Sequence, residues 1–199
     1  MPVDTAEASG LDAPRPEDPA RKPDEADAGQ VDGVGIIEAA RGDAEHLARV
    51  HHLSAVRAYG PILPSGGVWN FIDTWAHWRE AFDDRGIRVF AAVAGEGDDP
   101  DEREWLGVVS VRMHPDFQGD GELWRLYVVP DRWRQGIGTR LHDRAMALLR
   151  DMGVPAASLW VMEKNRTARS FYEHRGWRRL ADEDVADDGV RHLRYRHLL

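Results

Sequence analysis

Two glycines at the start of a predicted helix could bind an anion through the backbone. Gly136 and Gly138 follow an apolar run at 123–129 and open a segment whose apolar side chains recur at helical spacing as far as Met152. The first N–H groups of a helix lack intrahelical partners and lie at the positive end of its dipole. Glycine lets a phosphate approach them without an intervening Cβ. The pattern predicts a pyrophosphate-binding turn formed by Arg134, Gln135, Gly136, Ile137, Gly138 and Thr139.

Arg132, Arg134 and Arg140 add positive charge around this turn, which a purely structural turn does not require. A structural turn nevertheless stays open as the alternative, because many helices begin near glycine. Other phosphate motifs fit less well. A P-loop needs Gly-Lys-Ser/Thr, which is absent, and a dinucleotide fingerprint needs a third glycine where Leu141 stands.

Two further kinds of catalytic site are not expected. The adjacent His51 and His52 fall on different faces of a predicted helix, and no His-Glu-x-x-His spacing occurs, so we expect no metal. No Gly-x-Ser-x-Gly elbow occurs either, which argues against an acyl-serine route.

The composition indicates in which cellular compartment the protein works and which classes of partner it can bind. The chain of 199 residues has no cysteine, a formal net charge of -9 and no apolar run of the roughly 20 residues that span a bilayer. Its first residues lack the basic and apolar regions of a secretory signal. We therefore expect a cytoplasmic protein without membrane or nucleic-acid partners, because an acidic surface repels phosphate backbones.

The chain divides into a tail and one domain. Residues 1–33 hold five prolines, nine acidic and three basic side chains and almost no large apolar ones, so we expect a disordered tail. Residues 34–199 are expected to form a single α/β domain. Strands are predicted at 36–39, 87–93, 105–112, 121–129 and 157–162, with a closing pair at 177–180 and 191–196.

Four helices are predicted between these strands. The first begins after Asp43 as N-cap, and the second spans 69–83 with an aromatic stripe that favours core packing. The third follows Gly136 and stops at Gly153, and the fourth spans 166–174. The three strands between 87 and 129 are expected to form an antiparallel meander.

Two motifs resemble the GNAT superfamily of acyl-CoA N-acyltransferases over nearly the whole segment 36–198. The first is the strand and turn from Leu126-Tyr127-Val128-Val129-Pro130 through Arg134-Gln135-Gly136-Ile137-Gly138-Thr139-Arg140-Leu141. The second, about 30 residues later, is Asn165-Arg166-Thr167-Ala168-Arg169-Ser170-Phe171-Tyr172-Glu173-His174-Arg175-Gly176-Trp177. The resemblance implies a mixed, mostly antiparallel sheet of about six to seven strands with about four helices, and a V-shaped opening between the strands at 121–129 and 157–162.

The resemblance also implies how acetyl-CoA would bind as the acyl donor. Its pantetheine arm would pair with the backbone of Leu126, Tyr127 and Val128, and Asn165 would contact the arm with its side-chain amide. The family often has Gln or Arg three residues before the first loop glycine, where this chain has Trp133. The turn works mainly through main-chain N–H groups, so the expected cofactor site stands.

Catalysis in the family implies a direct transfer of the acetyl group to an amine, which needs an acid and a base. Tyr172 suits the acid because a phenol stays protonated at neutral pH, and Glu122 falls in the register of a general base in some relatives. Tyr172 could instead only pack its helix, and Glu122 could be a surface glutamate at a strand end. A catalytically inactive acyl-CoA-binding or sensing module is the alternative function.

The acceptor amine is not specified by the sequence. In relatives the first two helices and their connection form much of the acceptor wall, which here implies Tyr59, Trp69, Asp73 and Trp75. Aromatic rings beside a carboxylate would suit a cationic amine, although core packing explains the same residues. A small amine, an antibiotic, a peptide N-terminus and a protein lysine all stay open, as does a homodimer.

Overall fold

The computed structural model describes residues 33–63, 70–95, 99–114, 119–181, 184–187 and 189–199. The predicted tail therefore lies outside the described residues except for Gly33. The strands are β1 (Val34–Glu38), β2 (Arg88–Ala94), β3 (Glu104–Met113), β4 (Gly121–Val128), β5 (Ala156–Met162), β6 (Arg178–Arg179), β7 (Val185–Asp187) and β8 (Val190–Leu198). The helices are α1 (Ala44–Tyr59), α2 (Phe71–Asp83), α3 (Ile137–Asp151) and α4 (Arg166–His174).

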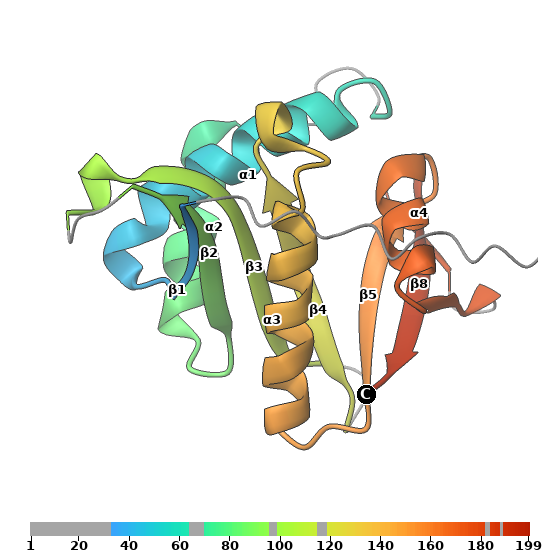
Figure 1. The fold of residues 1–199 in the computed structure, drawn as a ribbon. Helices are drawn as coiled ribbons and strands as arrows, with labels where there is room; N and C mark the ends of the chain where they lie inside the picture. The colour runs from blue at the N-terminus through green and yellow to red at the C-terminus, as the bar shows by residue number, and fades with distance from the viewer. Residues whose placement is uncertain (1–32, 64–69, 96–98, 115–118, 182–183, 188) are drawn as a thin grey trace, which may run out of the picture.

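The strands form one mixed sheet in the order β1-β2-β3-β4-β5-β8-β6, with β7 paired to β8 (Figure 1). The predicted meander is confirmed, because β2, β3 and β4 pair antiparallel in sequence. The closing pair is confirmed as β6 on β8. The strand β4 pairs with β5 in parallel, since α3 crosses over between them. The short strand β7 was not expected from the sequence.

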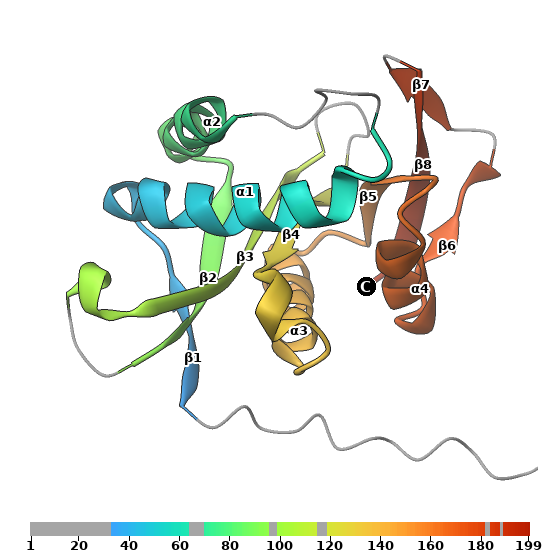
Figure 2. The ribbon, with the colours of Figure 1, turned by 90° about the horizontal axis from the view of Figure 1, so that it is seen from above.

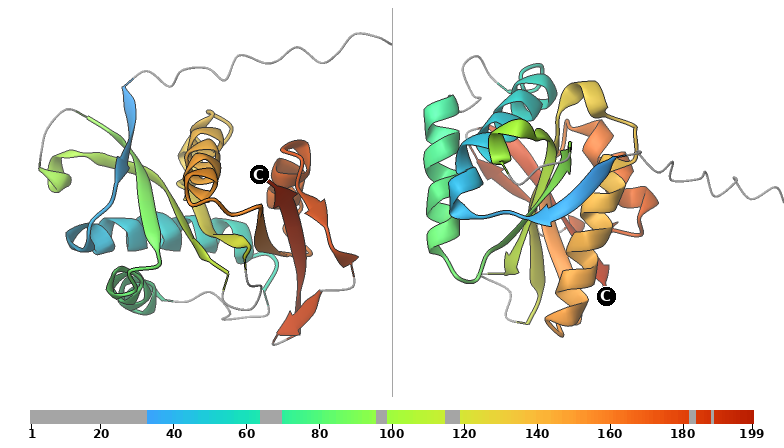
Figure 3. Two further views of the ribbon diagram at one scale, coloured as in Figure 1. Left: turned by 90° about the horizontal axis from the view of Figure 1, so that it is seen from below. Right: turned by 60° about the vertical axis from the view of Figure 1, so that its left-hand side comes forward.

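Helices cover both faces of the sheet. Figures 2 and 3 show α1 and α2 on one face, with α3 and α4 on the other. Leu47, Val50 and Trp78 pack into the core beneath α1 and α2. Leu141 and Tyr172 belong to the second core, on the α3 side. The predicted aromatic stripe of α2 is only partly core, because Trp78 is fully buried whereas Trp75 is exposed.

The two N-terminal helices begin near the predicted residues, and the cap of the first differs from the prediction. Helix α1 starts after Asp43, but the Asp43 carboxylate accepts from the Ala40 N–H at 2.8 Å and caps the preceding short turn. Helix α2 starts at Phe71, and the Asn70 side chain caps it by accepting from the Asp73 N–H at 3.0 Å. A side-chain cap of this kind satisfies one of the orphan N–H groups of the first turn.

Candidate active site

The strands β4 and β5 touch only at their first residues. Their parallel register contains the pairs Gly121↔Ala157 and Glu122↔Ser158, after which the two strands separate. A bulge marks the place on β4, because Ser110 and Val111 of β3 face Arg125 and Leu123 and leave Trp124 as the extra residue. The V-shaped opening implied by the family resemblance is therefore present (Figure 1).

A cavity of ≈ 1600 Å³ occupies this opening and extends towards α1 and α2. Among the described residues that line it there is no aspartate or glutamate. Its basic lining residues are Arg57, Arg125, Arg132, Arg134, Lys164, Arg166 and Arg175. This is unusual in a chain with a formal net charge of -9, and it makes the cavity a local attractor for anions.

The turn before α3 has a left-handed backbone at Gly136, a conformation that favours glycine. Gly136 is the N-cap residue with φ 82°, and Arg134 also has a positive φ, of 63°. The first helical bond runs from the Arg140 N–H to the Gly136 carbonyl at 3.1 Å. The N–H groups of Ile137, Gly138 and Thr139 therefore have no intrahelical partner and can bind an anion.

Some residues of this turn line the cavity, and others contact the rest of the protein. Arg134, Gly136, Gly138 and Thr139 line the cavity, as expected for a binding turn. Ile137 instead packs in the core, and the Gln135 side-chain amide donates to the Asp131 carbonyl at 3.1 Å.

Two of the three arginines noted around the turn have other partners. Arg132 bonds the Glu104 carboxylate at 3.0 Å, and Arg140 donates to the Val34 carbonyl at 2.8 Å. Sequence reasoning missed Arg175, which follows α4 and donates to the Thr139 hydroxyl at 2.6 Å. Its position becomes visible only when α4 is placed beside α3.

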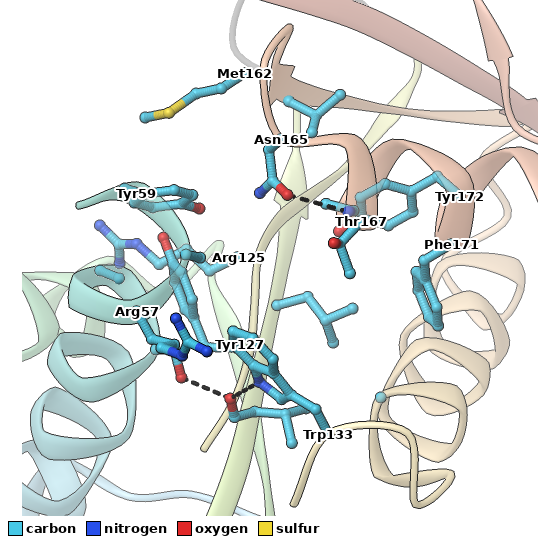
Figure 4. A pocket seen from close by; sticks show the side chains of 18 of the residues that line it. Arg57, Tyr59, Arg125, Tyr127, Trp133, Met162, Asn165, Thr167, Phe171 and Tyr172 are labelled. Carbon is cyan, nitrogen blue, oxygen red and sulfur yellow. Dashed lines mark hydrogen bonds between the residues drawn. The ribbon is translucent and has the colours of Figure 1, made fainter. Parts of the chain in front are cut away.

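The end of β4 presents backbone groups to the opening. Val129 donates to the Leu106 carbonyl of β3, so the main-chain groups of Val128 and of Leu126 point the other way, towards β5. The Val128 carbonyl already accepts from the Ser54 hydroxyl at 2.8 Å and from Trp133 Nε1 at 2.6 Å (Figure 4). Trp133, the departure from the family pattern, thus ties the turn to β4.

Tyr127 differs from its neighbours, because its side chain lies on the α1 face of the sheet. Its ring stacks on His51 with centroids 3.9 Å apart and lines the cavity. His51 is buried, its Nδ1 has no hydrogen-bond partner within the described residues, and burial lowers its pKa to about 3. His51 is therefore neutral at physiological pH.

Helix α4 brings Asn165 and Tyr172 to the wall opposite α1 (Figure 4). The Asn165 side-chain oxygen caps α4 by accepting from the Ala168 N–H at 3.1 Å, which leaves its NH₂ group for another partner. Tyr172 is buried, and burial, followed by the proximity of Tyr127, raises the pKa of its hydroxyl above the ordinary value. The hydroxyl consequently stays a proton donor through the physiological range.

Glu122 lies outside the set of residues that line the cavity. It is 3% exposed, and its carboxylate accepts from Arg112 Nε at 2.5 Å. The guanidinium of Arg112 in turn lies over the Trp124 ring, 4.3 Å from its centroid. This arrangement gives Glu122 an ion-pair partner outside the cavity lining, and it favours a structural role over that of a general base.

The three predicted acceptor residues that the structure describes are not brought together. Tyr59 lines the cavity, and burial, followed by the proximity of Tyr127 and a hydrogen bond with it, raises the pKa of its hydroxyl. Asp73 accepts from the Asn70 side chain at 2.8 Å and Trp75 lies under Arg79, and neither of them lines the cavity. Trp69 lies outside the described residues. Helix α2 contributes Thr74 and His77 to the lining instead.

Arg125 is the most prominent residue that sequence reasoning missed. It lines the cavity although its side chain and backbone together are only 8% exposed. Its guanidinium lies over Trp124 at 3.5 Å and over Trp78 at 4.8 Å from the ring centroids. Burial lowers its pKa to about 10, so it remains a cation at neutral pH.

A family model described as the acetyltransferase (GNAT) family matches residues 53–177. The chain belongs to the GNAT acetyltransferase family. The matched segment runs from the middle of α1 to the end of α4 and so contains most of the cavity. Membership places the chain among the acyltransferases, as the two sequence motifs predicted.

Curated relatives agree with this assignment. The uncharacterized N-acetyltransferase YuaI of Bacillus subtilis is 27% identical over 161 residues, which are 79% of this chain and 88% of that protein. The mycothiol acetyltransferase of Thermomonospora curvata is 34% identical over 121 residues, which are 59% of this chain and 36% of that protein. The chain thus spans well under half the length of the mycothiol acetyltransferases that it matches.

Solved structures share the GNAT fold. The PaiA N-acetyltransferase of Thermoplasma acidophilum, in complex with coenzyme A, has a TM-score of 0.63 at 19% identity and covers 82% of this chain and 99% of its own. An acetyltransferase from Thermus thermophilus has the same TM-score at 22% identity and covers 83% and 97%. These values establish the likeness of the fold alone.

The residues that the structure describes contain neither a cluster of metal ligands nor a membrane-spanning helix. No group of three or more histidine, aspartate and glutamate side chains within them is placed to hold a metal. No helix among them is long and apolar enough to cross a bilayer.

Proposed function

We propose that this chain transfers an acetyl group from acetyl-CoA to an acceptor amine by direct attack on the thioester. The observation that carries the proposal is the α3 turn, where three main-chain N–H groups lack intrahelical partners beside a cavity lined by seven basic side chains and, within the described residues, no carboxylate. Diphosphate and phosphate groups of CoA match that charge and those donors.

Other residues that line the same cavity would supply the remaining contacts to acetyl-CoA. The main chain of Leu126 is directed at the opening and would pair with the pantetheine arm, whereas the Val128 carbonyl already has two donors. The NH₂ group of Asn165 would meet a carbonyl of the arm. Arg134 and Arg175, on either side of the turn, would neutralise phosphate charge.

The reaction requires the amine nitrogen to bond to the acetyl carbonyl carbon while the carbon–sulfur bond breaks. The amine gives up a proton, and the departing thiolate takes one. Tyr172 would donate the proton to sulfur, since its burial keeps the phenol protonated.

No described carboxylate lines the cavity, and His51, with a pKa of about 3, is too weak a base at neutral pH. The acceptor would lose its proton to water or to one of the other histidines that line the cavity, His77, His174 and His192. The neighbouring Arg125 cation assists this loss, because a nearby positive charge disfavours the ammonium form.

The first experiment is a thermal unfolding scan with and without acetyl-CoA, followed by detection of free CoA thiol in the presence of an amine library. Acetyl-CoA should raise the midpoint by mass action, and thiol should appear with an acceptor. Absence of a shift at millimolar acetyl-CoA would refute the proposal. A shift without thiol release for any amine would favour the acyl-CoA-binding module. The cytoplasmic location expected from the sequence remains a prediction.

A further inference from the structure

Arg125 is a buried cation with an unsatisfied donor. Its Nη1 has no hydrogen-bond partner within the described residues, and only 8% of the residue's surface is exposed. Glu122, the carboxylate among the groups that shift the pKa of Arg125, is bonded to Arg112 at 2.5 Å. Leaving a buried charge without a partner is costly, so the position favours a ligand that supplies an anion.

The rings beneath Arg125 hold its guanidinium in place. Trp124 and Trp78 lie under it on the α1 and α2 face, where a planar cation packs favourably on aromatic rings. A planar guanidinium can present two parallel N–H groups to a carboxylate. Arg125, Tyr59 and Tyr127 lie on the same wall of the cavity (Figure 4).

Arg125 is also too far along β4 to serve the CoA phosphates. It precedes Val128 by three residues, a strand distance of roughly 10 Å, and Val128 is the residue that Trp133 ties to the phosphate turn. The guanidinium therefore faces the part of the cavity that the acceptor would enter between α1, α2 and β4.

We propose that the acceptor is an amine with a carboxylate within a few atoms of its nitrogen, such as a free α-amino acid, and that Arg125 binds this carboxylate. The inference rests on the proposed acetyl transfer and gives its substrate class. It replaces the cationic amine that Asp73 and Trp75 had suggested, since neither residue lines the cavity.

Pairing with Arg125 would also help the chemistry. A free carboxylate next to an ammonium group stabilises the positive charge and raises the pKa of that ammonium. When Arg125 neutralises the carboxylate, that stabilisation is lost and the neutral, nucleophilic amine becomes more accessible. One contact would thus both position the acceptor and lower the pKa of its amine.

The test compares matched acceptors on the wild-type protein. The twenty amino acids are offered with acetyl-CoA, and each active amino acid is compared with its decarboxylated amine and its amide, with spermidine and O-phosphoethanolamine added as a polyamine and a phosphate-bearing amine. We expect kcat/KM to fall by roughly 10- to 100-fold without the carboxylate, the scale of a charge-assisted hydrogen bond. Equal or faster turnover of the decarboxylated amine, the polyamine or the phosphate-bearing amine would overturn the inference.

Two variants test whether Arg125 is the residue that recognises the carboxylate. Arg125→Lys keeps the charge but loses the planar pair of N–H donors, so kcat/KM for the active amino acid should fall about 10-fold, and clearly more than kcat/KM for its decarboxylated amine. Arg112→Lys is the matched control, because Arg112 also lies over Trp124 but bonds Glu122 outside the cavity lining. A fall that is equal for both substrates, or equal in both variants, would assign Arg125 to packing.

Two measurements distinguish a wrong acceptor class from a failure of the proposed acetyl transfer. The acetyl-CoA dissociation constant is measured for each variant, and it should stay within a few-fold of the wild type. Binding of N-acetyl amino acids, the products, is measured by calorimetry on the wild type without any turnover. If acetyl-CoA binds but no N-acetyl amino acid binds at millimolar concentration, the acceptor class is wrong and the cofactor assignment stands.

Discussion

Tyr172 combines burial with a place on the cavity wall. Tyr172→Phe removes one hydroxyl and keeps the ring, so packing and acetyl-CoA affinity should change little. If the phenol protonates the thiolate, kcat should fall by roughly 10²- to 10⁴-fold, as measured by thiol release in saturating acetyl-CoA.

Glu122→Gln is the comparison variant for this measurement. Its carboxylate bonds Arg112 and does not line the cavity, so kcat should stay within a few-fold of the wild type. A loss of 10²-fold or more in Glu122→Gln would restore the glutamate as the base. A Tyr172→Phe variant at wild-type speed, with chemistry rate-limiting, would reduce Tyr172 to a packing role.

The titrating side chains of the wall also determine the pH profile. Burial raises the pKa of Tyr172, so the acid remains protonated and gives no falling limb at moderately alkaline pH. His51, with a pKa of about 3, gives no limb near neutrality. We therefore expect kcat/KM to rise with pH over about pH 6 to 9 as the acceptor amine loses its proton. A bell-shaped profile in that range would point to an unassigned acid or base.

At the scale of elements, the α3 turn should depend on one glycine more than on the other. Gly136 has φ 82°, which a β-branched residue rarely adopts, so Gly136→Val should abolish the thermal shift by acetyl-CoA. A Cβ at Gly138 would meet Val128 and Phe171 at 3.7 and 3.8 Å, ordinary contact distances. Gly138→Ala should therefore fold normally and keep a measurable shift. Unchanged acetyl-CoA affinity in Gly136→Val would refute the turn assignment.

The start of β4 is held to β8 by a partly buried ion pair. The Asp120 carboxylate accepts from Arg196 Nε at 2.8 Å and Nη2 at 3.0 Å, next to the residues where β4 still pairs with β5. The hydrogen bonds from Arg196 lower the pKa of Asp120. A depressed carboxylate pKa contributes stability above the unfolded value of about 3.9, and this stability is lost as the pH falls through the folded value.

Asp120→Asn should therefore lower the free energy of unfolding by about 1 to 3 kcal/mol at pH 7, measured by urea denaturation. The difference from the wild type should shrink below about pH 4, where the wild-type carboxylate becomes protonated. Asp151→Asn, at an exposed position on α3, serves as the control and should change stability by no more than about 0.5 kcal/mol. A deficit independent of pH would indicate packing rather than charge.

At the scale of the whole molecule, the described domain begins at β1. Val34 is buried, and its carbonyl accepts from Arg140 of α3 at 2.8 Å. Residues 1–33 carry almost no large apolar side chains. Deletion of residues 1–33 should therefore leave the thermal midpoint and its shift by acetyl-CoA nearly unchanged. Deletion of residues 1–38, which also removes β1, should lower the midpoint clearly. A large loss in the shorter deletion would show that the tail docks on the domain.

Local features could be read from the sequence alone because they depend on neighbouring residues. Gly136 needs a backbone that glycine adopts at little cost, and the 3.6-residue spacing after it specifies α3. The Asn165 and Tyr172 motif likewise lies within one helix, so its residues keep their spacing whatever surrounds them. The strand order of the meander followed from short connections between neighbouring strands.

Only the tertiary structure decided which side chains share the cavity. Strict alternation along β4 would place Arg125 on the same face as Leu123, under α3, but the bulge at Trp124 turns Arg125 towards Trp78 of α2. The same packing gives Glu122 an arginine partner outside the cavity. One extra residue in a strand reverses the faces of those that follow, and its effect depends on the register with β3, which lies far away in the sequence.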